Sequence, residues 1–282
     1  MGLALGLAPR AAWPESPRQH DLAKRETTRA LMRTLLDGIF GGASGVGYLG
    51  DMGVTPGALE DLAAASGSPG YSTSHQGGVG MGYAGPYVAR PGAASASFVD
   101  AWSTPLALET TATSVRLRSA GPDRDPSTTQ DNVYLPLEPR TTHGVIEVSA
   151  RSVPEGGGEA SVLDDGDVQV RVYYAVDGVE TSVQASYDSD AEVFRSTALH
   201  LGRHYVSVTA LTSEDFSVVG EDDVVWLRGR RARTSLRLVL EGEGTVVCHD
   251  PSGKNPRTKT VGDRALSAHL GHGDTLGPCD GD

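Results

Sequence analysis

The chain has 282 residues, a length that typically folds as two domains and leaves room for a small third unit. Asp and Glu outnumber Lys and Arg by 36 to 24, so the formal net charge is −12, and we expect no nucleic-acid partner because such a surface repels phosphate backbones. Hydrophobic residues make up 38% of the chain and glycine is abundant at 36 residues, which favours a loop-rich, strand-rich protein. The apolar stretch from Met1 to Pro9 is far shorter than the about 20 residues that span a bilayer, and no basic signal-peptide segment precedes it, so we expect no membrane anchor in this chain.

The first predicted element is an amphipathic helix. Residues 1–20 are rich in proline and lack periodicity, and they are predicted to form a tether. Over 21–40 apolar side chains recur at three- and four-residue spacing with basic residues between them, which predicts a helix that buries one face. Asp21 suits the N-cap, and the Gly41-Gly42 pair suits the end of the helix.

The next hundred residues predict short elements joined by long loops. A second helix is predicted over 56–65, where a proline stands in the first turn. Residues 66–98 are predicted to form a long loop, and strands are predicted at 104–109 and 113–118. Residues 122–142 are polar and rich in turn formers.

Beyond residue 142 the hydrophobic period becomes two. Valines and leucines alternate with polar residues, and Asp177-Gly178 predicts a tight turn between two strands. Several short strands within 143–241, without a helix pattern, predict a β-sandwich. The remaining residues, 242–282, contain both cysteines and are predicted to form a separate compact unit.

Several short motifs within 27–135 occur in a characteristic order. They are Arg29-Ala30-Leu31-Met32-Arg33-Thr34-Leu35-Leu36-Asp37-Gly38, Gly47-Tyr48-Leu49-Gly50-Asp51-Met52-Gly53-Val54-Thr55-Pro56, Gly85-Pro86-Tyr87, Asp100-Ala101-Trp102-Ser103-Thr104-Pro105 and Ser119-Ala120-Gly121-Pro122-Asp123. Together they resemble the globular part of type II secretion major pseudopilins and related prepilin-type proteins. The resemblance implies an α+β unit over 21–142, in which an N-terminal helix packs on a small antiparallel sheet.

The residues of these motifs suit structural roles. The flat side chains of Tyr87 and Trp102 can cover the helix, and Asp100 can accept backbone N–H groups in the turn before Trp102. Pseudopilins begin with a long hydrophobic helix that packs the filament. No such helix stands in this sequence, so we expect either a truncated chain or a head that has lost the assembly stem.

The loop over 119–132 offers only oxygen donors, which are the ligands that Ca²⁺ prefers. The matching loop of pseudopilins holds a structural calcium ion, and by position Asp123 and Asp131 match its ligands best. With Asp125 and Asn132 as further oxygen donors, these four residues are the expected calcium ligands. Asn132 stands where the family has a second acid, and the loss of a carboxylate weakens affinity. A solvated loop without calcium is therefore the alternative.

Residues 143–241 resemble small Ig-like or carboxypeptidase-regulatory-like sandwiches of exported proteins. His200 and His204 are four residues apart, but Gly202 and the strand context argue against a helical metal pair. The basic run over 228–233 is predicted to form a solvated hairpin turn, with contact to an anionic partner as the alternative.

The C-terminal unit resembles a short terminal module of bacterial exported proteins. The matching motifs are Cys248-His249, then Ala268-His269-Leu270-Gly271-His272-Gly273-Asp274, then Gly277-Pro278-Cys279. One interpretation is a disulfide between Cys248 and Cys279, a staple that a unit of this size needs. A second is a Cys₂His₂ zinc site. A hybrid combines the disulfide with zinc or another transition metal at His249, His269 and His272, with Asp274 orienting one ring.

These observations lead to a functional hypothesis. We expect a non-enzymatic structural subunit of a secretion- or pilus-like assembly, in the periplasm or on the surface of a bacterium, with protein partners that include copies of itself. The alternative is a surface-exposed binding or adhesion protein that uses the β-sandwich and the C-terminal unit. No nucleophile–base spacing or phosphate-binding loop indicates an enzyme, and a metal-dependent enzyme at the three histidines is the least favoured hypothesis.

Overall fold

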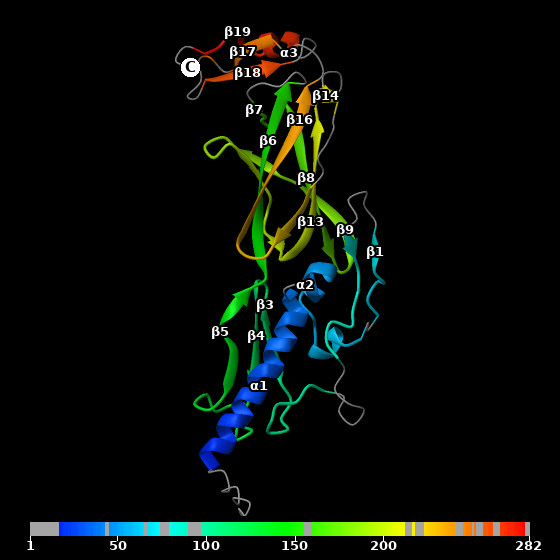
Figure 1. The fold of residues 1–282 in the computed structure, drawn as a ribbon, viewed down its shortest axis with the longest axis vertical. Coiled ribbons are helices and arrows are strands. Elements are labelled where there is room, and N and C mark those ends of the chain that lie inside the picture. The colour runs from blue at the N-terminus through cyan, green and yellow to red at the C-terminus, as the bar shows by residue number, and fades with distance from the viewer. Residues whose placement is uncertain are drawn as a thin grey trace, which may run out of the picture.

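The computed structural model of the chain describes segments between residues 17 and 279. These segments are 17–42, 45–64, 67–73, 79–89, 97–154, 160–211, 216–217, 223–240, 245–249, 251, 256–261 and 266–279. One long helix and many strands form an elongated molecule, in which the helix occupies one end, two larger sheets lie in the middle and a small C-terminal unit caps the other end (Figure 1). The described helices include none that is long and apolar enough to cross a membrane.

The end that contains the helix is built from short elements around one three-stranded sheet. In chain order they are α1 (Pro17–Phe40), α2 (Gly47–Met52), the 3₁₀ turn η1 (Leu59–Leu62), β1 (Ser72–Thr73), β2 (Gly80–Met81), β3 (Ala107–Thr111), β4 (Ser114–Ser119) and β5 (Val133–Thr141). Strands β3, β4 and β5 pair antiparallel in that order, and α1 contacts β4 and β5. The predicted helix on a small antiparallel sheet is therefore present.

Helix α1 buries a stripe of apolar side chains at the predicted spacing. The buried members are Met32, Leu35, Leu36 and Ile39. The helix ends at Phe40, as predicted, because Gly41 adopts a left-handed φ of 77°. It begins at Pro17, inside the predicted tether, since proline is tolerated in the first turn of a helix.

In this part of the chain one expectation was wrong and two elements were not predicted. The helix predicted over 56–65 is only the turn η1, which begins after the extended residue Ala58 and is held by the Ala58 N–H to Asp61 bond of 2.9 Å. The polar segment 122–142 contains β5, whose outer half is exposed and therefore carries no alternating hydrophobic pattern. Helix α2 was not predicted, because the glycines in this segment interrupt the hydrophobic pattern of a helix.

The middle of the molecule contains two sheets. Its strands are β6 (His143–Pro154), β7 (Ser161–Val162), β8 (Val168–Val176), β9 (Val179–Gln184), β10 (Ser186–Asp188), β11 (Val193–Arg195), β12 (Leu199–His200), β13 (Gly202–Ala210), β14 (Phe216–Ser217), β15 (Asp223–Leu227) and β16 (Arg231–Leu240). One sheet has the order β10-β11-β6-β16-β14, with β7 and β12 also paired to β6, and the other has the order β15-β13-β8-β9. Buried residues of both sheets belong to one hydrophobic core, as in a two-layer β structure.

Strand pairing in the larger sheet departs from the antiparallel pattern of a simple sandwich. Strands β6 and β16 run parallel, from the pair Val145–Arg231 to the pair Pro154–Leu240. The turn predicted at Asp177-Gly178 is confirmed, since it joins β8 to β9 with both residues at positive φ, 51° and 74°.

The C-terminal unit is a three-stranded sheet and one short helix. Its elements are β17 (Thr245–His249), β18 (Arg257–Val261), α3 (Leu266–Gly271) and β19 (Thr275–Leu276). The strand order is β18-β17-β19, and its small core is formed by Val247 and Val261 with Leu266 packed against them. It is not fully separate, because β18 contacts β7 of the larger sheet.

Helix α2 joins the first part of the chain to the sheets. It contacts β8 and β13, and the Gly178 N–H donates to the carbonyl oxygen of Met52 at 2.8 Å. A Cβ on Gly53 would overlap the carbonyl oxygen of Ala175, which shows how closely the two backbones approach. The two parts therefore share one continuous hydrophobic core.

Candidate functional site

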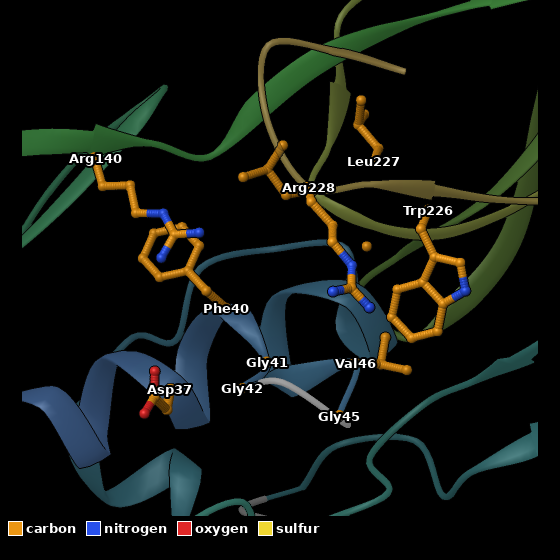
Figure 2. A pocket seen from close by; sticks show the side chains of 12 residues that line it. Asp37, Phe40, Gly41, Gly42, Gly45, Val46, Arg140, Trp226, Leu227 and Arg228 are labelled. Atoms are coloured by element: carbon orange, nitrogen blue, oxygen red, sulfur yellow. The ribbon is translucent and has the colours of Figure 1, made fainter. Parts of the chain in front are cut away.

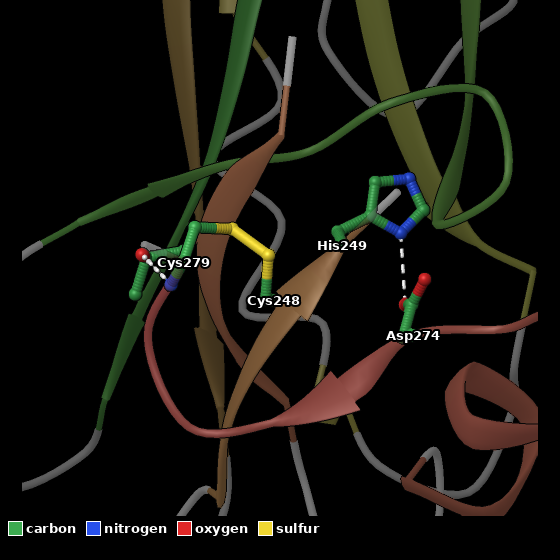
Figure 3. Close-up of a disulfide and its surroundings, with 5 residues drawn as sticks. Cys248, His249, Asp274 and Cys279 are labelled. Carbon is green, nitrogen blue, oxygen red and sulfur yellow. Dashed lines mark hydrogen bonds and ion pairs between the residues drawn. A yellow bond between two sulfur atoms is a disulfide. The ribbon is translucent and has the colours of Figure 1, made fainter. Parts of the chain in front are cut away.

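The candidate site lies where the C-terminal unit meets the loop between β7 and β8. His249 is the last residue of β17, His269 lies on α3, and Asp274 directly precedes β19. The disulfide at the neighbouring Cys248 fixes the position of β17 relative to the chain that follows β19 (Figure 3). The end of β17 is thereby held close to the segment of α3 and β19 that carries His269 and Asp274.

A single carboxylate oxygen holds the two imidazoles together. Oδ2 of Asp274 lies 2.8 Å from Nδ1 of His249 and 2.7 Å from Nδ1 of His269 (Figure 3 shows the first of these contacts). The centroids of the two rings are 5.7 Å apart and the rings are nearly perpendicular. Asp274 is buried, with 3% of its side chain exposed, whereas His249 is 29% exposed. The cluster is therefore anchored in the protein and reachable from solvent.

The far nitrogen of each imidazole faces a carboxylate from the β7–β8 loop. Nε2 of His249 lies 3.2 Å from Asp164, and Nε2 of His269 lies 3.5 Å from Asp167. Lys259 on β18 lies between these two acids, at 2.9 Å from Asp164 and 2.7 Å from Asp167, and its side chain is 3% exposed. These three residues could not be predicted from the sequence, because no local pattern connects Asp164 and Asp167 to a lysine on a distant strand.

Each charged group in this cluster stabilises the charged form of its neighbours. Burial by itself raises the pKa of Asp164, but the hydrogen bond with His249 and the charge of Lys259 outweigh it and hold that pKa well below its usual value. The pKa of Asp167 is lowered in the same way against its own burial, by His269 and Lys259. Burial lowers the pKa of Lys259, yet the two acids reverse this effect and raise it. The hydrogen bonds to Asp164 and Asp167 raise the pKa values of His249 and His269.

The cysteine prediction is resolved by the structure. Cys248 and Cys279 form a disulfide, with their Cα atoms 4.7 Å apart, so neither sulfur is available to a metal and the Cys₂His₂ alternative was wrong. His272 lies exposed in the turn after α3. Within the described segments, the trio of metal-ligating side chains that converges is His249, His269 and Asp274, with ligand atoms within 4.8 Å of one another. Asp274 thus takes the place that the sequence analysis gave to His272.

The acidic loop over 119–132 is held by its own hydrogen bonds. The Thr128 hydroxyl donates to Asp123 at 2.5 Å and lies 3.1 Å from Asp131. Asp125 accepts from the backbone and the hydroxyl of Ser127, which lowers its pKa. Asn132 lies 3.4 Å from the hydroxyl of Tyr134. Calcium at this loop stays a prediction that rests on the family resemblance.

The motif segments of the first part of the chain contact one another. The Tyr87 hydroxyl donates to Asp51 at 2.9 Å, which joins the third motif to the second. Asp100 accepts the N–H groups of Trp102 and Thr104 at 2.9 Å, as predicted, and its other oxygen accepts from Ser119 at 2.6 Å. These contacts hold the motif segments together in the fold.

A groove of about 520 Å³ lies on the outer face of the larger sheet. At its centre Glu147, with only 2% of its side chain exposed, is surrounded by Arg195, Arg231 and Arg233 at 3.0, 3.4 and 2.7 Å. Two of these arginines belong to the predicted basic run. They lie at the start of strand β16 instead of in a hairpin turn, which corrects that prediction.

A second cavity, of about 280 Å³, lies between the end of α1 and the sheets (Figure 2). Arg140 stacks on Phe40 with its guanidinium carbon 4.0 Å from the ring centroid, and Arg228 stacks on Trp226 at 4.8 Å. Asp37 also lines the cavity. Its walls come from both parts of the chain, so it marks their junction.

Compared with known proteins, the chain matches no family model, no curated protein and no solved structure.

Proposed function

We propose that the chain is a non-enzymatic structural subunit of a secretion- or pilus-like assembly outside the bacterial cytoplasm. The observation that carries the proposal is the joint arrangement of the motif segments: α1 lies on the sheet β3-β4-β5, and the Asp100–Trp102 turn is tied to α1 by the Ala101 N–H to Thr28 bond of 3.1 Å. A pseudopilin-like head has this order of helix, loops and sheet, and in this chain the head is the unit over residues 21–142. In this proposal the two-sheet region is an Ig-like sandwich that the head carries outward.

Exposed apolar residues on the head support contact between copies. Leu22 on α1 is 63% exposed, and Leu137 on the edge strand β5 is 79% exposed. An edge strand with an exposed hydrophobic side chain is a ready surface for pairing with another chain. The Cys248–Cys279 disulfide supports an oxidising compartment, where such bonds persist.

Photo-crosslinking tests this proposal directly. A photoreactive amino acid is placed at Leu22 or at Leu137, and a control variant carries it at Val179, which is 60% exposed at the start of β9. We expect crosslinks between copies, or to other subunits of the assembly, from Leu22 and Leu137 in the native bacterium, and few from Val179. The proposal is overturned if the head positions give no crosslinks there and the purified chain sediments as a monomer at all concentrations.

The groove around Glu147 favours a second candidate function, a surface-exposed binding protein. Three arginines face the buried carboxylate of Glu147, and one of them, Arg195, is also paired with Asp188 at 2.6 Å, so the groove keeps a surplus of positive charge in a chain whose net charge is −12. A crosslink from Ser235, which lines this groove, to a different protein, without crosslinks from the head, would favour this candidate.

A further inference from the structure

We propose that His249, His269 and Asp274 bind one zinc-class divalent transition-metal ion, through Nδ1 of each histidine and a carboxylate oxygen of Asp274. This proposal concerns the C-terminal unit alone and is independent of the assembly role of the head. Two imidazole nitrogens and one carboxylate oxygen form a donor set that suits zinc and its neighbours, whereas calcium prefers oxygen donors throughout.

The geometry of the donors supports a shared ion. The two Nδ1 atoms lie at 2.8 and 2.7 Å from the same oxygen of Asp274, so all three donors converge on one point. Metal–ligand bonds of about 2.0–2.2 Å separate the donors of a tetrahedral site by about 3.4 Å. The carboxylate has to retreat by a fraction of an ångström, and the two imidazole nitrogens, which lie within 4.8 Å of each other, have to move closer together to hold the ion. Three protein donors leave a fourth position for water or for a donor from another molecule.

The outer contacts are those of a metal-binding histidine. A histidine that ligates a metal through one nitrogen almost always donates its other N–H to a carboxylate, a carbonyl or water. Here the remaining nitrogen of His249 faces Asp164 at 3.2 Å, and that of His269 faces Asp167 at 3.5 Å. Both carboxylates are fixed in turn by Lys259. The imidazoles are thus held with Nδ1 directed at Asp274 from both sides.

The charge balance also suits a divalent cation. With neutral imidazoles, the carboxylates of Asp164, Asp167 and Asp274 outnumber the cations near them, which are Lys259 and the guanidinium group of Arg257 whose charge acts on Asp164. A divalent ion compensates this surplus of negative charge beside the buried carboxylate of Asp274. The rival hypothesis is an ionic network without metal, in which both imidazoles carry a second proton.

The test measures zinc binding to the full-length chain with its disulfide intact. After treatment with a chelator, the chain is equilibrated with Zn²⁺, and the bound metal is counted by elemental analysis and the affinity measured by calorimetry. Co²⁺ in place of Zn²⁺ reports the ligand set through its visible absorption. We expect one ion per chain, with retention of the ion in excess Ca²⁺.

Matched variants connect the ion to these residues. Asp274→Asn and His269→Gln are expected to abolish stoichiometric binding, whereas His272→Gln, an exposed histidine just after the same helix, is expected to bind as the parent does. Asp164→Asn is expected to weaken binding about 10–100-fold, as loss of an outer carboxylate does elsewhere. Circular dichroism and a check of the disulfide show whether each variant folds. If one of them does not fold, His249→Gln replaces it, and we expect this variant to lose the Co²⁺ absorption.

Two results overturn the proposal. Failure of the folded chain to bind stoichiometric Zn²⁺ or Co²⁺ would leave the ionic network as the explanation of the cluster. Binding that survives Asp274→Asn and His269→Gln, or that is lost equally in His272→Gln, would place the ion elsewhere. Neither result bears on the crosslinking test of the head, so the two proposals fail separately.

Discussion

At the residue scale, Lys259 shows how the C-terminal unit is attached to the rest of the molecule. It is buried between Asp164 and Asp167, and breaking a buried ion pair by removing one partner costs about 3–5 kcal/mol because a buried charge is left without compensation. We therefore expect Lys259→Met to lower the free energy of unfolding by about that amount in urea titrations at neutral pH. Arg33→Met, an exposed position on α1, is the control and should change it little. Equal stabilities of the two variants would contradict a structural role for this cation.

A second residue-scale prediction concerns His204, which is buried on β13 with its Nε2 2.8 Å from the carbonyl oxygen of His200. Burial lowers the pKa of His204 to about 4, whereas an unfolded histidine titrates near 6.5. Its contribution to stability is fully present above about pH 6.5 and is lost as the pH falls toward 4, because the unfolded state takes up the proton first. By pH 5 the loss amounts to about 2 kcal/mol.

Urea unfolding of the parent and of His204→Gln at pH 7 and pH 5 isolates this contribution. The variant loses the titrating group, so its stability should fall less between the two pH values than that of the parent. His20→Gln, at an exposed position on α1, should keep the pH dependence of the parent. Parallel pH profiles for all three proteins would show that His204 is not held neutral.

At the scale of elements, the C-terminal sheet depends on its disulfide. Among the described residues of this unit, the apolar cluster consists of Val247, Val261 and Leu266, which is too little apolar surface for independent stability. The bond closes a loop with a sequence separation of 31, which the chain-entropy model values at about 3–4 kcal/mol. We expect the double substitution Cys248→Ser with Cys279→Ser to accelerate amide hydrogen exchange in β17, β18 and β19 while leaving β4 unchanged. If exchange rises equally in β4, or rises in neither region, the disulfide does not stabilise the C-terminal sheet locally.

Some elements of the fold and of the site could be predicted from the sequence, and others could not. Helix α1 and the Asp177-Gly178 turn follow from local periodicity and turn chemistry, and both are present. The disulfide pairing remained one alternative among several, because thiols and imidazoles at this spacing suit either a bond or a metal. Strand β5 and the acids around Lys259 could not be predicted, since an edge strand with an exposed outer half and a contact between distant loops leave no local pattern.

At the scale of the whole molecule, the contact between α2 and the β8–β9 hairpin decides whether the head and the sheets behave as one body. Gly53 and Gly67 offer a matched comparison, because both have a left-handed φ, 68° and 69°, but only Gly53 lies against another element. An alanine at either position incurs about 1–2 kcal/mol of backbone strain. At Gly53 its Cβ would also overlap the carbonyl oxygen of Ala175, which adds about 1–3 kcal/mol of overpacking.

We therefore expect Gly53→Ala to be less stable than Gly67→Ala by about 1–3 kcal/mol in denaturant titrations. The new methyl group must push α2 away from β8, and this movement breaks the bond from the Gly178 N–H to Met52. Hydrogen exchange at Gly178 should consequently accelerate in Gly53→Ala and not in Gly67→Ala. If exchange at Gly178 and stability are the same in both variants, the head is not coupled to the sheets through α2. The head would then not fix the orientation of the two-sheet region that it is proposed to carry.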